Sequence, residues 1–292
     1  MMLQPNGTAT LSGLRIAVPN KGSLSQAATE MLRESGYRQR QDAKELTLVD
    51  AENGVEFYYL RPRDIALYVG EGTLDIGITG RDLLLDSGAK AEEVLTLGFG
   101  RSRFQFAGPV GEFTDLRQLA GRRIATSYVG VVRTYLEDRG IDASVVRLDG
   151  AVETSVRLGV ADVIADVVET GSTLRQAGLE VFGETILDSE AVLITRGGEA
   201  PAGLEVFKRR LEGVLVARTY VMMDYDIATA HVDAAVTLTP GIEGPTISPL
   251  HRDGWVAVRA MVPRAGAQRL MDELYDLGAR GILLTDIHAC RL

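Results

Sequence analysis

The sequence predicts an α/β protein with two similar lobes around a cleft, followed by a small C-terminal ferredoxin-like domain. Through the first two thirds of the chain, apolar runs of strand length alternate with helical segments, as in α/β domains. A short motif recurs, because Glu71–Gly80 aligns with Leu158–Val167 when Gly72 is placed on Gly159. The last segment, from about residue 213, has the element order βαββαβ, which is the ferredoxin-like pattern.

The first lobe is predicted over residues 13–102 and 188–211. Residues 1–12 are expected to be a loose leader outside the fold, and LRIAVP is the first strand. A helix follows, which Ser23 or Ser25 can cap and Gly36 can end. The pair Asn53-Gly54 predicts a hairpin between ELTLVD and VEFYYL. Two further helices, RPRDIALYVGEG and RDLLLDSG, flank the buried strand TLDIGITG.

The second lobe is predicted over residues 103–187. Its strands are RRIATSYV, ASVVRLDG and ADVIADVV, and its helices are VVRTYLEDRG, AVETSVRLG and a segment that begins at STLRQAG. LEVFGETILDSEAVLITRG contains two strand-like runs that are expected to return to the first lobe. Two crossings between lobes predict a hinge with a cleft.

The third domain is predicted over residues 212–292, after the helix EVFKRRLEGVLVA. Its predicted strands are VLVARTYVMMDYD, GPTISPL, WVAVRAMVP and GILLTDIHACRL, and its predicted helices are IATAHVDAAVTL and AGAQRLMDELYDLG. A segment of this length can form a separate small domain.

Composition excludes several classes of protein. A net charge of -9 argues against general nucleic-acid binding, which requires a basic face. No apolar run approaches the roughly 20 residues of a membrane helix, and no secretory signal is visible. The single cysteine, Cys290, provides no disulfide framework, and three late histidines do not suggest a zinc site. We therefore expect a cytoplasmic protein.

The stretch VIADVVETGSTL carries the strongest chemical signal. Asp166 interrupts a buried strand, and a turn of small residues with Glu169 follows it before a helix. Backbone N–H groups in such a turn suit a phosphate, and Gly171 permits a positive φ. Three hydroxyl groups add donors: those of Thr170, Ser172 and Thr173. The alternative is a strand–helix turn in which Ser172 or Thr173 is only an N-cap.

The same stretch, as DVIADVVETGSTL, resembles the phosphoribosyl pyrophosphate (PRPP) loop of ATP phosphoribosyltransferases, which catalyse the first step of histidine biosynthesis. The resemblance runs in register from Leu14 to the end, through RIAVPNKGSL, FYYLRPRDIALYV, GITGRDLL, LDGAVETSVRLGVAD, DYD and GPTISPL. Because it includes the third domain, the chain resembles the long form of the family.

The resemblance implies roles for the second-lobe residues. The 5-phosphate of PRPP lies on Glu169, Thr170, Gly171, Ser172 and Thr173, with Asp166 at the ribose. Glu153 approaches the ribose or the pyrophosphate.

Further roles are implied at the first lobe. Lys21 and Arg61 face the nucleotide and pyrophosphate, and Arg81, Asp82 and Tyr128 line the adenine-nucleotide pocket. Structural alternatives exist: Lys21 as a solvated helix-start residue, Arg61 as a partner of Asp64, Asp82 as a helix cap and Tyr128 as a core-edge aromatic.

The implied reaction joins N1 of the ATP adenine to C1 of PRPP and releases pyrophosphate. It needs no protein nucleophile, but it needs aligned substrates and cations on the leaving oxygens. Mg²⁺, Lys21 and Arg61 would supply that charge. The sequence identifies neither the metal ligands nor a general base.

In the third domain, the resemblance implies a regulatory site for histidine as a feedback inhibitor. Asp226, Thr246 and Gly281 are its expected residues, although Asp226 could instead cap a helix. Gly244 departs from the Ser expected before Pro-Thr. The family also implies dimers that assemble into hexamers.

Two other functions remain open at this stage. Two periplasmic-binding-protein-like lobes also suit a non-enzymatic solute-binding protein, but such proteins are usually exported and would not need ETGST beside a buried acid. A stand-alone amino-acid sensor would use only the third domain, and it leaves the PRPP-like loop unexplained.

Overall fold

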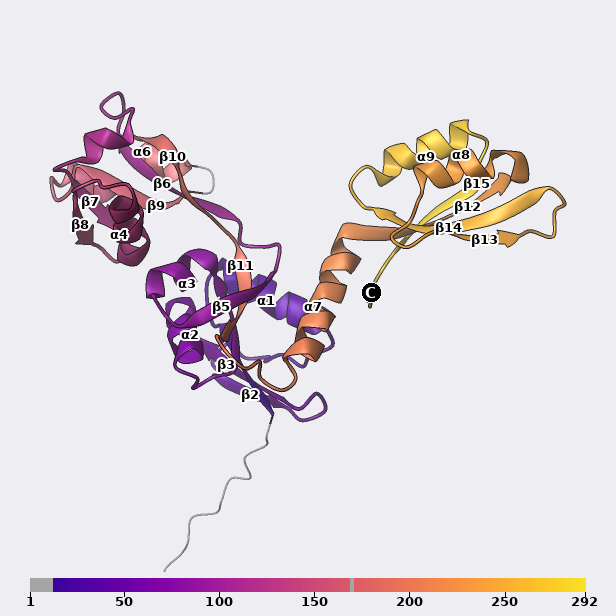
Figure 1. Ribbon diagram of the computed structural model, residues 1–292, viewed down its shortest axis with the longest axis horizontal. Coiled ribbons are helices and arrows are strands. Elements are labelled where there is room, and N and C mark those ends of the chain that lie inside the picture. The colour runs from indigo at the N-terminus through magenta and orange to yellow at the C-terminus, as the bar shows by residue number, and fades with distance from the viewer. Residues whose placement is uncertain (1–12, 169–170) are drawn as a thin grey trace, which may run out of the picture. The chain divides into compact units, whose positions relative to one another are not determined.

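The computed structural model describes residues 13–168 and 171–292, which form two compact units. The first unit reaches to Leu32 and continues over Tyr37–Glu205, and the second contains Arg33–Gly36 and Val206–Leu292. Two mixed sheets belong to the first unit and one antiparallel sheet to the second (Figure 1). These sheets confirm the α/β fold class predicted from the sequence.

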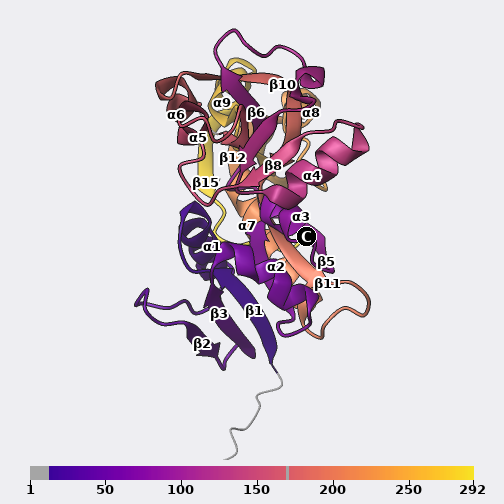
Figure 2. The ribbon, with the colours of Figure 1, turned by 90° about the vertical axis from the view of Figure 1, so that its left-hand side faces the viewer.

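The first sheet, with its helices, is called lobe I. Its strand order is β2-β3-β1-β4-β11-β5, and β1 is parallel to both β3 and β4. Figure 2 shows β1, β2 and β3 side by side in this sheet. β2 and β11 run antiparallel to their neighbours. Its strands are β1 (Leu14–Pro19), β2 (Thr47–Asp50), β3 (Val55–Leu60), β4 (Ile76–Gly80), β5 (Ala91–Thr96) and β11 (Ala191–Arg196). Its helices are α1 (Ser23–Glu34), α2 (Pro62–Gly70) and α3 (Arg81–Ser87).

The second sheet, with its helices, is called lobe II. Its strand order is β10-β6-β9-β7-β8, with β7 parallel to β8 and β9, and β6 antiparallel to β9. Its strands are β6 (Ser102–Pro109), β7 (Arg123–Thr126), β8 (Ser144–Arg147), β9 (Val163–Val168) and β10 (Leu179–Ser189). Its helical segments are η1 (Leu116–Leu119), α4 (Val129–Asp138), α5 (Thr154–Arg157) and α6 (Ser172–Gln176).

The chain crosses between the lobes twice, as predicted. It leaves lobe I after β5 and returns between β10 and β11. Each lobe has three parallel strands beside one antiparallel strand that follows a crossing, β11 in lobe I and β6 in lobe II. The two lobes therefore share one topology, which supports the duplication that the repeated motif indicates.

Matching ion pairs strengthen this relationship. In lobe I the carboxylate of Asp75 accepts from the Arg15 amide at 2.7 Å and from its guanidinium. In lobe II the carboxylate of Asp162 accepts from the Arg123 amide at 2.9 Å and from its guanidinium. Each pair closes the start of the central parallel strands, so the two aligned aspartates have the same structural function.

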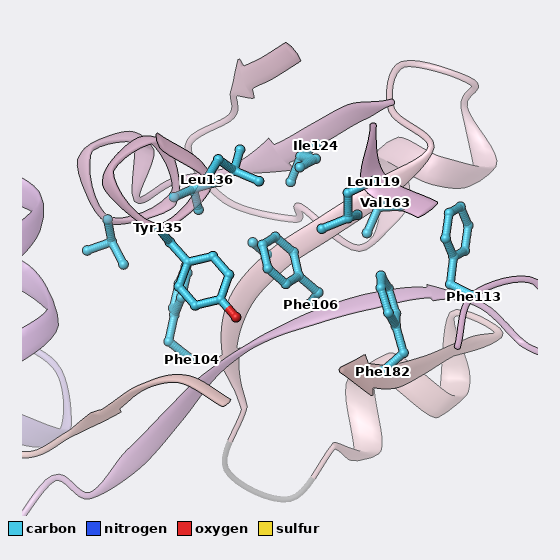
Figure 3. Packing of buried hydrophobic residues seen from close by; sticks show 12 residues of the cluster. Phe104, Phe106, Phe113, Leu119, Ile124, Tyr135, Leu136, Val163 and Phe182 are labelled. Carbon is cyan, nitrogen blue, oxygen red and sulfur yellow. The ribbon is translucent and has the colours of Figure 1, made fainter. Parts of the chain in front are cut away.

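Aromatic rings fill the core of lobe II (Figure 3). The Phe106 ring lies 5.6 Å from Tyr135 and 6.2 Å from Phe182, and Phe182 stacks on Phe113 at 5.2 Å, centroid to centroid. These rings come from β6, α4, β10 and the segment before η1. The core thus joins elements on both sides of the β9 strand that carries Asp166.

The second unit has the predicted ferredoxin-like topology. Its sheet order is β13-β14-β12-β15, all antiparallel, and α8 and α9 cover one face (Figure 1). Its elements are α7 (Leu204–Thr219), β12 (Tyr220–Ala228), η2 (Thr229–His231), α8 (Val232–Leu238), β13 (Thr246–Pro249), β14 (Trp255–Pro263), α9 (Ala267–Asp276) and β15 (Arg280–Asp286).

Some individual elements differ from the prediction. Residues 214–217 were assigned both to the helix EVFKRRLEGVLVA and to the strand after it, and 218–219 to the strand alone. All six end α7, because Leu204, Phe207, Leu211 and Val214 are buried at helical spacing. Ile227 and Ala228, expected in a helix, end β12. The helix predicted over AVETSVRLG is only the turn α5. Strands β5 and β6 were not predicted.

The aromatic core gives a stability prediction. Phe106→Ala should lower the free energy of unfolding by about 3–5 kcal/mol, because it leaves a cavity beside the rings of Tyr135 and Phe182. Leu158→Ala is the control, since Leu158 is 74% exposed and its loss should cost within about 0.5 kcal/mol. Urea unfolding followed by circular dichroism measures both. Equal midpoints for the two variants would contradict the packing described.

Candidate functional site

Two predicted cations lie at the carboxyl edge of the lobe I sheet. Lys21 follows β1 and Arg61 follows β3, and these parallel strands are paired up to Pro19 and Leu60. Gly22 has a φ of 79°, which lets the chain turn directly into α1. Both side chains are exposed at the edge where open α/β sheets bind ligands, so an anion could reach them.

Arg81, the first residue of α3, is held by acidic side chains. Its guanidinium donates to both carboxylate oxygens of Glu93, at 2.9 and 2.7 Å, and lies 3.8 Å from Glu190. The bond to Glu93 raises the pKa of Arg81. Arg81 lines a cavity of about 650 Å³ beside the crossings, but two carboxylates already balance its charge. Its role in a nucleotide pocket stays a prediction.

Asp82 is buried in the first turn of α3. Its amide donates to Ser189 Oγ at 3.0 Å, and that hydroxyl donates to Asp82 Oδ1 at 3.0 Å. Gly80, not Asp82, is the N-cap of α3, so the cap alternative does not hold. Because Ser189 ends β10, this pair ties α3 to the return crossing.

Tyr128 packs against the aromatic core of lobe II from its edge. Its ring meets the buried Phe104 edge-on at 5.1 Å, and the guanidinium of Arg63 lies over it at 4.5 Å. Burial raises the pKa of its hydroxyl, and the carboxylates of Asp82 and Asp166 raise it further. The hydroxyl is therefore protonated at neutral pH and interacts with Asp82, so Tyr128 is both a packing residue and a polar one.

Asp166 lies in β9, opposite Gln105 of β6, with its side chain partly buried. Burial raises the pKa of this carboxyl group, and the charges of Glu153 and Asp82 add to the effect. The Val167 amide, which donates to Asp166 Oδ1 at 2.8 Å, and the charge of Arg63 oppose it. The folded protein thus disfavours the charged form of Asp166, and we call Asp166 a strained acid for this reason. Its carboxyl group interacts electrostatically with Glu153 of lobe II and Asp82 of lobe I.

Glu153 is positioned by an unusual turn. Ala151 has a φ of 46°, the only positive value among the described non-glycine residues, and Gly150 before it has a φ of 89°. Residues other than glycine rarely adopt this left-handed backbone conformation, and those that do are often found at functional sites. Val152 is buried, which anchors the turn, and the charge of the next residue, Glu153, contributes to raising the pKa of Asp166. The sequence analysis did not detect this turn.

The predicted phosphate turn is described only in part, because Glu169 and Thr170 lie outside the described residues. Gly171 is the N-cap of α6 with a φ of 68°, as its predicted conformational role requires. Ser172 and Thr173 form the first turn of α6 and are exposed. Their binding roles remain predictions.

Arg63 is the functional candidate that the sequence analysis missed. The motif RPRD contains two arginines, and the family resemblance implied a substrate-binding role only for Arg61. Arg63 extends to lobe II, where it donates to the Ser127 backbone oxygen and to Ser127 Oγ, both at 2.9 Å. Nothing in the local sequence distinguishes the two arginines, because the partner lies 64 positions away.

In the second unit, Asp226 lies on the sheet face opposite α8 and α9. Alternate residues of β12, including Tyr225 and Ile227, are buried against these helices, so Asp226 points away from them. A Cβ on Gly281 would lie 3.6 Å from Asp226 Oδ2, so the two residues adjoin. Thr246 lies in β13, beyond β14. Asp226 sits within a strand and caps no helix.

The described part of the chain contains neither a cluster of metal-ligating side chains nor a helix suited to cross a membrane. Within 13–168 and 171–292, no group of three or more His, Cys, Asp or Glu side chains could hold a metal ion. In the same ranges, no helix combines the length and hydropathy of a membrane span.

The fold and the polar residues at the crossings define a two-lobed α/β protein with a candidate ligand site between its lobes and a separate ferredoxin-like domain. Residues 61–213 match the family model of ATP phosphoribosyltransferase, and residues 217–289 match the HisG C-terminal domain. The ATP phosphoribosyltransferase of Arthrobacter sp. (strain FB24) is 65% identical to this chain, and the match covers 96% of this chain and 100% of the relative. That of Streptomyces avermitilis is 67% identical with the same coverage.

A solved structure agrees with these relatives. The ATP phosphoribosyl transferase (HisG:HisZ) complex from Thermotoga maritima contains a chain 26% identical to this one, with a TM-score of 0.59. The match covers 68% of this chain and 96% of that one. The chain belongs to the ATP phosphoribosyltransferase family.

The raised pKa of Asp166 predicts how the stability of the protein changes with pH. A carboxyl group whose pKa is raised by folding stabilises the fold at low pH, and that stability is lost as pH rises through the folded pKa. Asp166→Asn should therefore stabilise the ligand-free protein at neutral pH by about 1 kcal/mol, or roughly 2–4 °C. The gain should shrink as the pH falls.

Asp162→Asn is the matched control, because hydrogen bonds from Arg123 lower the pKa of Asp162. A lowered pKa stabilises the fold above the unfolded pKa, so this variant should be less stable at neutral pH. Thermal unfolding between pH 4 and 7 measures both. A destabilised Asp166→Asn protein at neutral pH would show that Asp166 is not strained.

Proposed function

We propose that this transferase joins N1 of the ATP adenine to C1 of PRPP and releases pyrophosphate, as the first step of histidine biosynthesis. One observation supports this assignment above the others. Asp166 of lobe II interacts electrostatically with Asp82 of lobe I, with the Tyr128 hydroxyl and with Glu153 of its own lobe. Acceptors for ribose hydroxyls and polar groups suited to a purine therefore converge from both lobes, as a two-substrate reaction requires.

In this proposal the lobe II turn binds PRPP. Backbone and hydroxyl donors of residues 169–173 hold the 5-phosphate, and Asp166 accepts hydrogen bonds from the ribose, with Glu153 beside it. A carboxylate kept partly dry is a strong acceptor, and ribose hydroxyls replace the water it lost on folding. That gain on binding offsets the strain of the free protein.

Transfer occurs at C1 of the ribose. The bond from C1 to the pyrophosphate oxygen breaks, the pyrophosphate leaves with the electron pair, and the adenine N1 lone pair forms the new bond. Positive charge builds on the ribose while negative charge builds on the leaving oxygens. Lys21 and Arg61, exposed at the lobe I edge, face those oxygens. Arg81, Asp82 and Tyr128 orient the adenine nucleotide.

Members of the family use a divalent metal, and we propose that it is Mg²⁺ carried by PRPP. The described residues offer no protein cage for an ion. Mg²⁺ needs only one or two carboxylates when substrate phosphates supply the other ligands. Glu153 and Asp166 fit that smaller demand, and the ion would neutralise the leaving pyrophosphate.

The second unit is proposed to bind histidine as a feedback inhibitor. Asp226 and Gly281 adjoin on the uncovered sheet face, where the carboxylate can pair with an amino or imidazole group and the glycine leaves room beside it. Thr246 is the third proposed contact. The proposed domains are 13–102 with 188–211, then 103–187, then 212–292. Assembly into dimers and hexamers, and a cytoplasmic location, are part of the same proposal.

The enzyme assignment is favoured over a solute-binding protein. Two lobes and a cleft suit both classes, but the chain belongs to a family of transferases. A stand-alone amino-acid sensor is also disfavoured, since the match to that family includes the lobes.

The first test of function follows product formation. With ATP, PRPP and Mg²⁺, phosphoribosyl-ATP absorbance should increase, and no product from a folded sample would overturn the proposal. Asp166→Ala and Thr173→Ala should each weaken PRPP binding about 10- to 100-fold, as expected for losing a hydrogen bond to a charged group. Calorimetric titration measures this. PRPP affinity retained in both variants would refute the loop assignment.

The second test concerns regulation. Asp226→Asn should raise the histidine concentration for half-inhibition at least about tenfold, since it removes the charge that pairs with the ligand. Activity without histidine should be unchanged. Asp224→Asn is the control on the same strand face, and its main effect should be the loss of an exposed pair with Arg259. Unchanged inhibition of Asp226→Asn would place the histidine site elsewhere.

A further inference from the structure

The N-terminus of helix α4 in lobe II is capped by a side chain from lobe I. The carboxylate oxygen Oδ1 of Asp86, near the end of α3, accepts from the amides of Gly130 and Val131 at 2.8 and 3.3 Å. The first amides of a helix have no partner within it, and a negative charge there is stabilised by the helix dipole. Tyr128, the N-cap residue of α4, makes no side-chain capping bond of its own. Lobe I thus supplies the cap that lobe II lacks.

Arg63 adds a second connection between the same elements. Its two terminal nitrogens donate to the backbone oxygen and the hydroxyl of Ser127, each at 2.9 Å, and Nη1 lies 3.4 Å from Asp86 Oδ2. One guanidinium therefore bridges α2, α3 and the start of α4. A planar fork of donors can satisfy all three acceptors at once, which an ammonium group cannot do as well.

Gly130 allows the close approach. A Cβ at this position would lie 2.5 Å from the backbone oxygen of Asp86, closer than side chains are ever found. The residue is helical, where alanine is preferred to glycine. A glycine in this place is therefore explained by the lobe–lobe contact and not by the helix itself.

The contact also reaches the predicted substrate residues. Arg63 lies over the Tyr128 ring at 4.5 Å, one residue after Ser127. We propose that Arg63, Asp86, Ser127 and Gly130 form an interlobe latch, which holds the two lobes at one separation and positions Tyr128 for the transfer step. Arg63 is a positioning residue in this proposal, since it acts through Tyr128 and the lobe spacing.

The latch is distinct from the crossings. The strands β5–β6 and β10–β11 connect the lobes covalently and would do so at many separations. The latch contacts can be lost without removing a core side chain, because none of the four latch residues belongs to the buried clusters of the two lobes. Removing the latch should change the distance between lobes while each lobe stays folded.

The interlobe distance tests this directly. In a Cys290→Ser background, spin labels at Glu52→Cys in lobe I and Glu112→Cys in lobe II give a distance distribution by electron paramagnetic resonance. Both positions are exposed. Arg63→Met and Gly130→Ala should each broaden the distribution and move its mean by more than about 2 Å. The latch is refuted if neither variant changes the distribution.

Arg139→Met is the matched control. Arg139 lies over the Tyr135 ring at 3.6 Å and pairs with Glu184, the same kinds of contact made within lobe II alone. Its removal should leave the distance distribution unchanged. Gly130→Ala is the sharper variant, since a purely local role for Gly130 predicts a more stable helix and no movement of the lobes.

Kinetic measurements test the positioning role of Arg63. This part of the proposal rests on the proposed function, whereas the distance measurement is independent of it. Arg63→Met and Gly130→Ala should lower kcat at least tenfold and leave PRPP affinity within about threefold, because the PRPP turn lies in one lobe. Arg63→Lys should recover part of the rate. Altered distances with an unchanged kcat would overturn the positioning role. Failure of the wild-type protein to form product would instead count against the proposed function.

Discussion

The register of two antiparallel strand pairs determines where the site lies. β11 pairs with β4 so that Ala191, the first residue after the return crossing, lies opposite Gly80. In lobe II, β6 pairs with β9 so that Arg103 lies opposite Val168. The carboxyl ends of β4 and β9 are thereby placed at the crossings. α3, which follows β4 directly, therefore begins beside the hinge, and so does the end of β9 that carries Asp166.

This constraint explains why a tightly packed core lies so close to a partly buried acid and a left-handed turn. The rings of Phe104 and Phe106 anchor β6 in the core, one and three positions after Arg103. Asp166 lies in β9, whose Val163 and Ala165 belong to that core, and the left-handed Ala151 precedes Val152, which is buried in a second cluster of the same lobe. Strain of this kind persists only where surrounding packing fixes it. The aromatic core of lobe II therefore supports the acid that the proposed reaction uses.

The sequence predicted the elements whose local pattern agrees with their tertiary role. Strands β1 and β9 are apolar runs with turn residues after them, and α2 has proline in its first turn. β5 was missed because AEEVLT is an edge strand with two exposed acids, so its composition does not resemble a buried strand. β6 did carry a signal, since Phe104 and Phe106 alternate with polar residues.

The candidate site was predictable only where a motif marks it. Asp82, Tyr128 and Asp166 stand in motifs shared with the family, and all three lie in one electrostatic neighbourhood. Arg63 and Gly130 could not be found in this way. Their partners are 64 and 44 positions distant, and neither contact follows from the period of a helix or strand. Long-range contacts between lobes require the crossings to be known first.

The duplicated lobes show how one topology serves two different substrates. The shift that aligns Asp75 with Asp162 also aligns Thr79 of β4 with Asp166 of β9. Thr79 is fully buried, and its hydroxyl donates to the Pro62 backbone oxygen at 2.9 Å, so this position in lobe I is used for packing. In lobe II the same position carries an acid that remains partly accessible. Under the proposed function, only lobe II offers a carboxylate to a ribose at this position, so the two lobes present different chemistry at equivalent places in one topology.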